Sequence, residues 1–277
     1  MIEIQGLNFS HNRRKKALFD ELDCKVEAGS IVGLLGKNGA GKTTLLKLLT
    51  GLLYPESGHV KVNEHLPAKR NPSFLEELFF VSEEFYLPSA SISQYIKANA
   101  GFYPHFDFAT LDSLLTEFEL PETKNLQRLS YGQKKKFLIS FALSTKCKLL
   151  ILDEPTNGLD IPSKSTFRKV VAGTLDEDQL VIISTHQVKD VENLIDKILL
   201  IEKGKIILQK DLFDLSSKLE FSFSHSGEGE EVLYSEMVPG GYKVITPQYN
   251  GHSSVDIELL FNAITAGNEK FMKYVNQ

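Results

Sequence analysis

The chain has 277 residues, which is enough for one sizeable domain with a large buried core, or for one domain with a small appendage. Hydrophobic residues make up 42% and charged residues 24%, the composition of an ordinary soluble globular protein. The formal net charge of −5 argues against broad nucleic-acid binding, which usually shows as a basic chain or a basic stripe.

Two further features of the sequence concern its cellular location. No stretch reaches the ~18–20 apolar residues needed to cross a bilayer, and residues 1–4 have neither the charged start nor the apolar run of a signal peptide. Cys24 and Cys147 lie far apart, without metal or redox spacing, and are predicted to be reduced core thiols of a cytosolic protein. If a membrane is involved, another chain must cross it.

The N-terminal part of the chain predicts a series of strands. Apolar residues alternate over residues 2–9, a second strand ends near Val26, and the apolar run at 31–35 is typical of a short buried strand. The basic segment between them, residues 11–16, is predicted to be a solvated loop, with an anion-binding patch as the alternative.

A glycine-rich segment, residues 36–44, lies between that buried strand and a predicted helix at 42–51. Strand, glycine loop and helix in this order are the context in which such a loop binds phosphate. Backbone N–H groups can point inward at an anion, and the helix adds its positive end. Lys42 would reach the β- and γ-phosphates, and the Thr43 hydroxyl would bind Mg²⁺. The predicted nucleoside triphosphate site consists of Gly36, Lys37, Asn38, Gly39, Ala40, Gly41, Lys42, Thr43 and Thr44.

The middle of the chain changes character after short predicted strands around 60–62 and 79–81. Residues 83–146 are predicted to be helical, because apolar residues recur there at helical spacing. Aromatic residues concentrate in this part, as Tyr95, Phe102, Tyr103, Phe106 and Phe108. Most of them are predicted to build its small core, and some could instead line a docking surface for a partner helix.

Strands return after residue 147. Apolar residues 149–152 lead into Asp153 and Glu154, and a second run at 181–183 leads into a polar triplet that ends at His186. Both runs predict buried parallel strands, whose C-terminal edge is where open α/β sheets bind ligands. With a helix predicted at 163–175 and a hairpin at 198–208, the pattern implies a largely parallel sheet with an antiparallel portion at its start and end.

The chemistry of these strand ends follows from the residue types. Asp153 can hold Mg²⁺, directly or through water. Glu154 can polarise a water for in-line attack on the γ-phosphorus. His186 can hydrogen-bond the γ-phosphate and so sense its presence. The plainer alternatives are a solvated strand end for the two acids and a satisfied core histidine, and the phosphate loop in the same sequence favours the functional interpretation.

Residues 216–277 form a different piece. Short strands are predicted at 219–223, 232–234 and 242–245, followed by a closing helix at 253–264. The helix would begin with a capping box of Ser253 and Asp256. This segment carries no chemical motif, so a structural or interaction role is expected for it.

Together the motifs resemble the ATP-binding subunit of an ABC transporter, over residues 1 to about 215. Beside the Walker A loop at 36–44, the family's signature motif appears as Leu129-Ser130-Tyr131-Gly132-Gln133, with Tyr131 where glycine is commoner. The other matching motifs are the Walker B strand at 149–153, a D-loop at 158–160 and the switch histidine His186. All of them occur in the family's order, and the overall pattern most resembles bacterial exporters of the ABC-2 type.

The resemblance implies an α/β fold of the P-loop NTPase type with an ABC-type core. This fold would have a mostly parallel sheet, an antiparallel β subdomain and an inserted helical subdomain. The ATP-binding domain would span 1–215, with its core at 1–82 and 147–215 and its helical subdomain at 83–146. A small α+β extension of strands and a helix would follow at 216–277.

The resemblance also implies a shared active site. In ABC proteins the signature motif faces the Walker A loop of a second subunit, so Ser130, Gly132 and Gln133 would bind ATP held by another copy or by a related subunit in a head-to-tail dimer. ATP hydrolysis would power transport through a separate integral membrane subunit, docked around residues 83–108 at the inner face of the cell membrane. No nucleic-acid partner is expected. The alternatives are a soluble ABC ATPase without a transport role and a regulatory nucleotide-binding module.

Two positions depart from the family pattern. Glu83 stands where the family commonly has glutamine, and its carboxylate could still approach Mg²⁺ and the attacking water. His11 stands where an aromatic residue usually stacks on the base. An imidazole offers less stacking area than tyrosine, so adenine affinity or base selectivity would be reduced.

Overall fold

The computed structural model describes residues 1–12, 16–121, 125–249 and 251–276. Arg13, Arg14 and Lys15 of the predicted basic loop lie outside the described residues. Within the described ranges, no helix is both long enough and apolar enough to cross a membrane.

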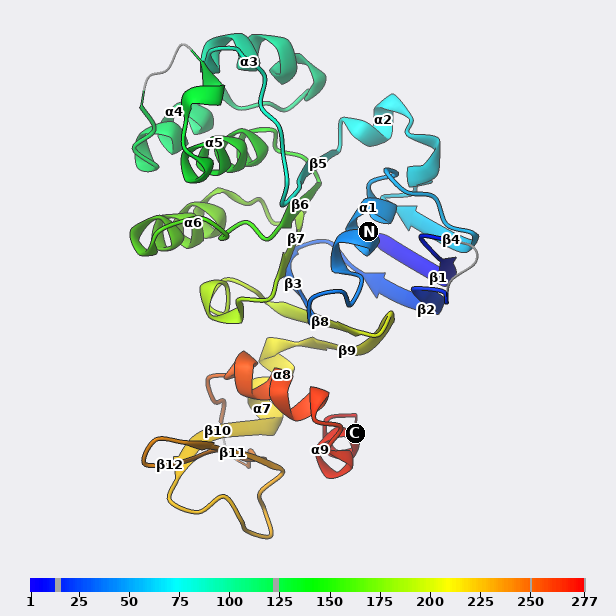
Figure 1. Ribbon diagram of the computed structural model, residues 1–277, viewed down its shortest axis with the longest axis vertical. Helices are drawn as coiled ribbons and strands as arrows, with labels where there is room; N and C mark the ends of the chain where they lie inside the picture. Colours follow the sequence, from blue (N-terminus) through cyan, green and yellow to red (C-terminus); the bar gives the residue numbers. More distant parts are fainter. Residues whose placement is uncertain (13–15, 122–124, 250, 277) are drawn as a thin grey trace.

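A mostly parallel sheet runs through the middle of the molecule (Figure 1). Its strands are β3 (Ser30–Leu35), β5 (Leu78–Val81), β6 (Leu149–Asp153), β7 (Leu180–Thr185), β8 (Lys197–Glu202) and β9 (Lys205–Asp211). They lie in the order β5-β6-β7-β3-β8-β9, and every neighbouring pair is parallel except the β8–β9 hairpin. The predicted fold class is therefore confirmed for this sheet.

The apolar runs of the central strands are explained by burial on both faces. Successive side chains of a strand point to opposite faces of the sheet. In β6, Leu149 and Ile151 join one hydrophobic cluster, whereas Leu150 and Leu152 join the other. A strand with two buried faces needs apolar residues throughout, which is why the sequence there does not alternate.

An antiparallel sheet and one helix cover the first of these faces. The sheet contains β1 (Ile2–Phe9), β2 (Phe19–Val26) and β4 (Ser57–Val62) in the order β2-β1-β4. With α1 (Lys42–Leu49) it forms the blue lobe at the right of Figure 1. The glycine-rich loop enters α1 between this lobe and the parallel sheet.

Helices cover the other face. Those between β5 and β6 are α3 (Ile92–Asn99), α4 (Phe108–Glu117) and α5 (Tyr131–Ser144), and α6 (Ile161–Thr174) joins β6 to β7 (Figure 1). Shorter elements are α2 (Pro72–Leu75) and the 3-10 turns η1 (Pro67–Lys69), η2 (Ala100–Phe102), η3 (Leu126–Arg128) and η4 (Val188–Asp190).

Of the aromatic residues concentrated in this part of the chain, some pack into its core and others are exposed. Tyr95, Tyr103 and Phe106 pack on Phe141, whereas Phe102 is 70% exposed.

The C-terminal part differs in detail from the prediction. It contains α7 (Leu212–Lys218), β10 (Leu219–Ser224), β11 (Tyr234–Val238), β12 (Gly241–Pro247), α8 (Ile257–Thr265) and α9 (Glu269–Val275). The expectation of one closing helix from residue 253 was wrong, because α8 begins four residues later and α9 follows it. The Asp256 carboxylate caps α8 at the N–H of Leu259, whereas the Ser253 hydroxyl donates to the carbonyl of Leu219. That contact with β10 explains why Ser253 does not cap the helix.

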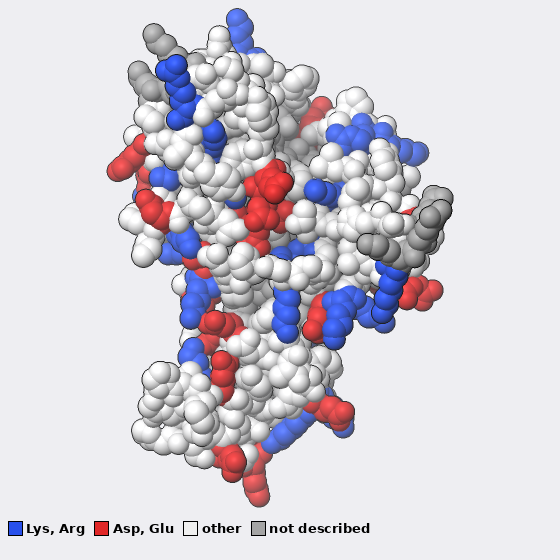
Figure 2. Space-filling model, in the orientation of Figure 1, with Lys and Arg blue, Asp and Glu red and all other residues white. Residues whose placement is uncertain are grey.

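Basic and acidic side chains are intermixed on the face shown in Figure 2. Acidic side chains gather near its middle, between the lobe of helices α3–α5 and the lobe that carries α1. The basic side chains of the described residues visible on this face are scattered and do not line up as a continuous stripe.

The two cysteines are free and buried. Burial raises the pKa of each thiol, Cys24 and Cys147, to about 12. Because the thiolate is the reactive form, we expect both to resist iodoacetamide at about pH 8 in the folded protein and to react fully in urea. Intact-protein mass spectrometry measures the labelling. Equal labelling rates with and without urea would contradict the buried positions of these thiols.

Candidate functional site

The loop between β3 and α1 has a shape that only glycine allows at two positions. Gly41, the N-cap of α1, has φ +109°, and a Cβ there would lie 2.9 Å from the Phe19 ring. A Cβ on Gly36 would lie 2.5 Å from the carbonyl oxygen of Ile201. Both positions are therefore closed to larger residues, and the loop passes directly over the end of the parallel sheet.

Lys42, the first residue of α1, points back over the loop. Its side chain is only 7% exposed, and its ammonium donates to the carbonyl of Gly36 over 2.7 Å. Burial lowers the pKa of the ammonium, and nearby carboxylates oppose this effect. These carboxylates belong to Glu154, Asp153 and Glu83. A phosphate entering the loop would find a cation already held at its edge.

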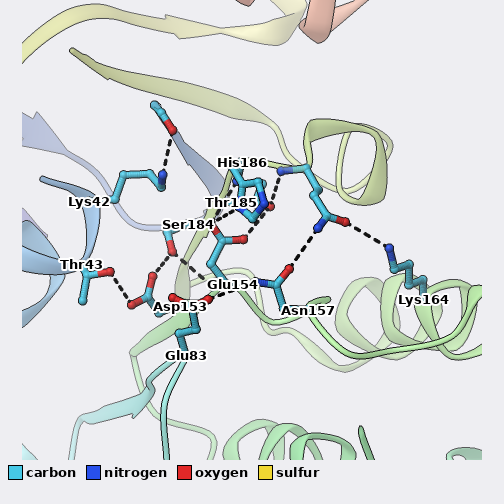
Figure 3. Close-up of polar contacts among 12 residues, drawn as sticks. Lys42, Thr43, Glu83, Asp153, Glu154, Asn157, Lys164, Ser184, Thr185 and His186 are labelled. Atoms are coloured by element: carbon cyan, nitrogen blue, oxygen red, sulfur yellow. Dashed lines mark hydrogen bonds and ion pairs between the residues drawn. The ribbon is translucent and has the colours of Figure 1, made fainter. Parts of the chain in front are cut away.

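Thr43 connects α1 to the end of β6. Its hydroxyl donates to Oδ2 of Asp153 over 2.8 Å, and the Ser184 hydroxyl donates to the other oxygen of the same carboxylate (Figure 3). Asp153 is fully buried. A threonine hydroxyl beside a carboxylate supplies two hard oxygen donors, the kind that Mg²⁺ takes from proteins when phosphate oxygens complete its shell. The residues present therefore fit a magnesium ion.

Glu154 follows directly and is also held on several sides (Figure 3). Its Oε1 accepts a hydrogen bond from the backbone N–H of His186, over 3.1 Å, and lies 2.7 Å from Nδ1 of the same imidazole. Its Oε2 accepts from the Thr185 hydroxyl over 3.2 Å. With φ +47°, Glu154 occupies the left-handed region, which costs a residue with a side chain about 1–3 kcal/mol and which only a rigid surrounding maintains.

Most of the candidate residues line one cavity of about 400 Å³, a volume within the range of small-molecule sites. Its walls are His11, Leu18, Asn38, Gly39, Gly41, Lys42, Thr43, Thr44, Glu83 and Glu154. They come from the N-terminal lobe, the glycine loop, the segment after β5 and the end of β6. Residues far apart in the sequence are thus brought together around Lys42.

Other predicted residues lie beside this cavity or away from it. Asp153 is beneath it and reaches it through Thr43. His186 lines a neighbouring pocket of about 600 Å³, together with Gly36 and Lys37, and reaches the first cavity through Glu154. Ala40, in the middle of the loop, is buried. None of the described side chains of the signature segment lines the cavity around Lys42.

The signature segment instead begins helix α5. Ser130 is the N-cap, its hydroxyl accepts from the N–H of Gln133, and the Gln133 side chain accepts from the N–H of Ser130. A Cβ on Gly132 would lie 2.8 Å from the carbonyl oxygen of Gly158 in the predicted D-loop. The exposed Ser130 and its helix terminus can therefore meet an anion only from outside this cavity.

The two residues that depart from the family pattern, Glu83 and His11, both line the cavity and both form a hydrogen bond to another residue of the site. Glu83 lines the cavity, and its Oε1 accepts from the side-chain amide of Asn157 over 3.1 Å. His11 is exposed at the cavity rim, 3.0 Å from the Thr44 hydroxyl through Nε2, with its ring edge-on to Phe9. The imidazole is thus available beside the loop, held by a hydrogen bond to a loop residue.

Sequence reasoning missed residues that connect these parts. Asn157 accepts from the Gln187 side chain while it donates to Glu83, and so joins the segment after β5 to the one after β7 (Figure 3). Leu18 adds an apolar contact to the cavity. Neither belongs to a polar motif that a single sequence exposes, although Asn157 lies directly before the D-loop.

A family model described as ABC transporter matches residues 19–157. The match includes the glycine loop, the signature segment and the Walker B strand. The chain belongs to the ABC transporter family. It is an ATP-binding cassette, and ATP hydrolysis is the reaction that such cassettes catalyse.

Relatives and solved structures of this family share most of the chain. The lantibiotic transport ATP-binding protein SrtF of Streptococcus pyogenes is 32% identical over 81% of this chain and 96% of its own length. The SkfA peptide export ATP-binding protein SkfE of Bacillus subtilis is 33% identical over 76% and 89%. The dimeric structure of a bacterial ABC transporter cassette, MJ0796, has a TM-score of 0.66 and 19% identity, and covers 76% of this chain and 99% of that one. This last likeness concerns the fold.

Proposed function

We propose that this cassette is the ATPase subunit of a membrane transporter, and that it powers export through separate membrane-spanning subunits. The observation that carries the proposal is the cavity around Lys42, where a phosphate loop, a candidate magnesium site and Glu154 meet. The names of SrtF and SkfE, which refer to lantibiotic transport and peptide export, support transport over a soluble or purely regulatory role.

The proposed roles follow from the contacts. The Gly36–Thr44 loop and Lys42 bind the phosphates, and the Thr43 hydroxyl and Asp153 would hold Mg²⁺, which would neutralise phosphate charge. Glu154 accepts the proton of the attacking water, and His186 orients the Glu154 carboxylate. His11 and Leu18 receive the base, and Glu83 lines the same cavity, where its carboxylate could approach a bound Mg²⁺.

A dimer would complete the site. Among the residues that the structure describes, the cavity lining includes none of the signature segment, whereas Ser130, Gly132 and Gln133 present a helix start that can receive an anion at the beginning of α5. We propose that a second copy, or a related cassette, places its signature segment over the ATP of the first, head to tail. ATP then joins the two cassettes, and hydrolysis releases them. The dimeric structure of MJ0796 supports the pairing of two cassettes.

The membrane subunit would dock beside the helical lobe. A groove of about 690 Å³ lies between that lobe and the end of α1, and its exposed apolar walls include Phe102, Pro104 and Leu52. Phe102 and Pro104 belong to the segment 83–108 in which the sequence predicted a docking surface. A transporter subunit bound there would place the cassette in the cytoplasm, at the inner face of the cell membrane.

Two measurements test the proposal. The purified cassette is expected to release phosphate from ATP in the presence of Mg²⁺. EDTA is expected to stop this release, because Thr43 and Asp153 cannot supply the positive charge that the metal would supply.

From gently solubilised native membranes, the cassette is expected to co-purify with an integral membrane protein. An active cassette that is recovered from membranes only by itself would instead support the soluble, non-transport alternative. A purified cassette that binds ATP but releases no phosphate would support a regulatory module.

A further inference from the structure

Lys135 is a fully buried lysine in helix α5, outside the groups to which the proposed function assigns a role. Its side chain has 0% exposure, although lysine is almost never fully buried unless its charge is paired. Its ammonium donates to the backbone carbonyl of Glu154 over 2.7 Å. The helix that begins with the signature segment is therefore tied directly to the residue proposed to activate water.

Aromatic rings surround the rest of the ammonium. The Nζ atom lies 5.3 Å from the ring centroid of Tyr131 and 5.9 Å from that of Phe85, and these two rings stack on each other. The negative faces of aromatic rings stabilise a desolvated cation. Burial lowers the pKa of Lys135, and the carboxylates of Glu83 and Glu154 are among the groups that oppose this effect.

The backbone of Glu154 needs such support. Its φ of +47° is a conformation that residues with a side chain rarely adopt, and surrounding contacts must maintain it. The N–H of Glu154 donates to the carbonyl of Ser184 over 3.0 Å. Its carbonyl accepts from Lys135 and, over 3.3 Å, from the N–H of Asn157. Lys135 thus supplies the shorter of the two contacts that fix the peptide following Glu154.

The same helix also touches the segment after β5. The Tyr131 hydroxyl donates to the carbonyl of Glu83 over 3.0 Å, and a Cβ on Gly158 would lie 2.6 Å from the Tyr131 ring. Tyr131 stands where the family more commonly has glycine, so this chain has a side chain that packs against two loops of its own site. The start of α5 and Glu154 are therefore held as one unit.

We propose that Lys135 is a positioning residue for ATP hydrolysis: from helix α5 it holds the backbone of Glu154 so that the carboxylate faces the cavity. The proposal rests on the proposed function of Glu154. Because Ser130 and Gln133 form the first turn of the same helix, the contact also links the water-activating group of one site to the signature segment presented to the other.

The test compares Lys135→Met with Lys134→Met in the 277-residue chain. Methionine fills the buried space but donates no hydrogen bond, and Lys134 is the neighbouring, partly exposed lysine of α5. Lys135→Met is expected to lower kcat by about 10- to 100-fold, the cost of a misplaced catalytic group. The KM for ATP is expected to stay within about twofold, because the phosphate loop is untouched. Lys134→Met is expected to behave like the wild type.

A double-mutant cycle shows whether Lys135 acts through Glu154. In the Glu154→Gln background, adding Lys135→Met is expected to leave the residual rate unchanged, since the group being positioned is already disabled. A further tenfold loss in that background, a kcat of Lys135→Met equal to that of the wild type, or a rise in KM in place of a fall in kcat would overturn the inference. If the wild-type protein itself hydrolyses no ATP, the proposed function fails, and not the inference about Lys135. Binding of an ATP analogue, measured together with thermal melting, shows whether each variant has folded.

Discussion

Lys42→Ala is expected to abolish tight ATP binding. The ammonium is held at the edge of the loop with 7% exposure, where water does not screen its attraction to phosphate. A hydrogen bond to a charged group contributes about 1.5–3 kcal/mol, so its loss is expected to weaken ATP binding by about 10- to 150-fold. Isothermal titration of the purified variant with Mg²⁺ and ATP measures the change, and phosphate release should fall to background.

The matched control for this variant lies one turn and a half further along α1. Lys47 is a partly exposed lysine in the last turn of the same helix and does not line the cavity. Lys47→Ala removes the same charge from the same helix and is expected to bind ATP like the wild type. If Lys42→Ala binds ATP as tightly as the control, residues 36–44 are not the phosphate-binding loop.

The sequence was sufficient to predict those parts of the fold and of the site that depend only on neighbouring residues. The run 149–152 had to be a strand buried on both faces, and the acids that follow it had to lie at the strand end. The glycines at 36, 39 and 41 similarly required a tight loop before α1. The structure places Lys42, Thr43 and Glu154 around one cavity, as these patterns suggested, while their chemical roles remain proposals.

Contacts between distant segments were the part that the sequence could not predict. Lys135 lies between Lys134 and Lys136, and such a run is ordinarily a solvated face. Only the packing of α5 against the Glu154 segment turns the middle lysine inward. The prediction that Ser253 begins the closing helix failed for a related reason, because the Ser253 hydroxyl donates to the carbonyl of Leu219 in β10. The seven-residue α9 depends on burial of Phe271 and Val275, which its short local pattern does not reveal.

The C-terminal extension is also less separable than its sequence indicated. Its buried residues, among them Leu219 and Ile257, belong to the same hydrophobic cluster as Val191 and Ile198 beside the parallel sheet. An ion pair of 2.8 Å joins Lys189 of η4 to Glu258 of α8. Deleting residues 217–277 would therefore expose apolar surface of the core, so variants of the active site are best compared in the 277-residue chain.

Glu154→Gln is expected to keep ATP binding, to slow hydrolysis and to accumulate a dimer. Glutamine has the shape of glutamate, so its carbonyl oxygen can still accept a hydrogen bond from the Thr185 hydroxyl or the His186 N–H. It cannot take a proton from water at neutral pH, and general-base catalysis contributes about 10²- to 10⁴-fold to a rate. Because hydrolysis is the step that separates the two cassettes, the head-to-tail pair is expected to stay associated when ATP is bound and hydrolysis is blocked. Light scattering with ATP should then report a doubled molar mass.

Glu84→Gln is the matched control, because Glu84 is an exposed acid near the site that does not line the cavity. This variant removes the same negative charge and is expected to hydrolyse ATP at the wild-type rate and to show no lasting dimer. The two readouts of Glu154→Gln separate the two parts of the proposal. Hydrolysis at the wild-type rate would exclude Glu154 as the base. Slow hydrolysis by a variant that stays monomeric with ATP would keep Glu154 as the base but would reject ATP-driven dimerisation of the isolated cassette. In that case, the membrane subunit would be needed to bring the signature segment to the partner cassette.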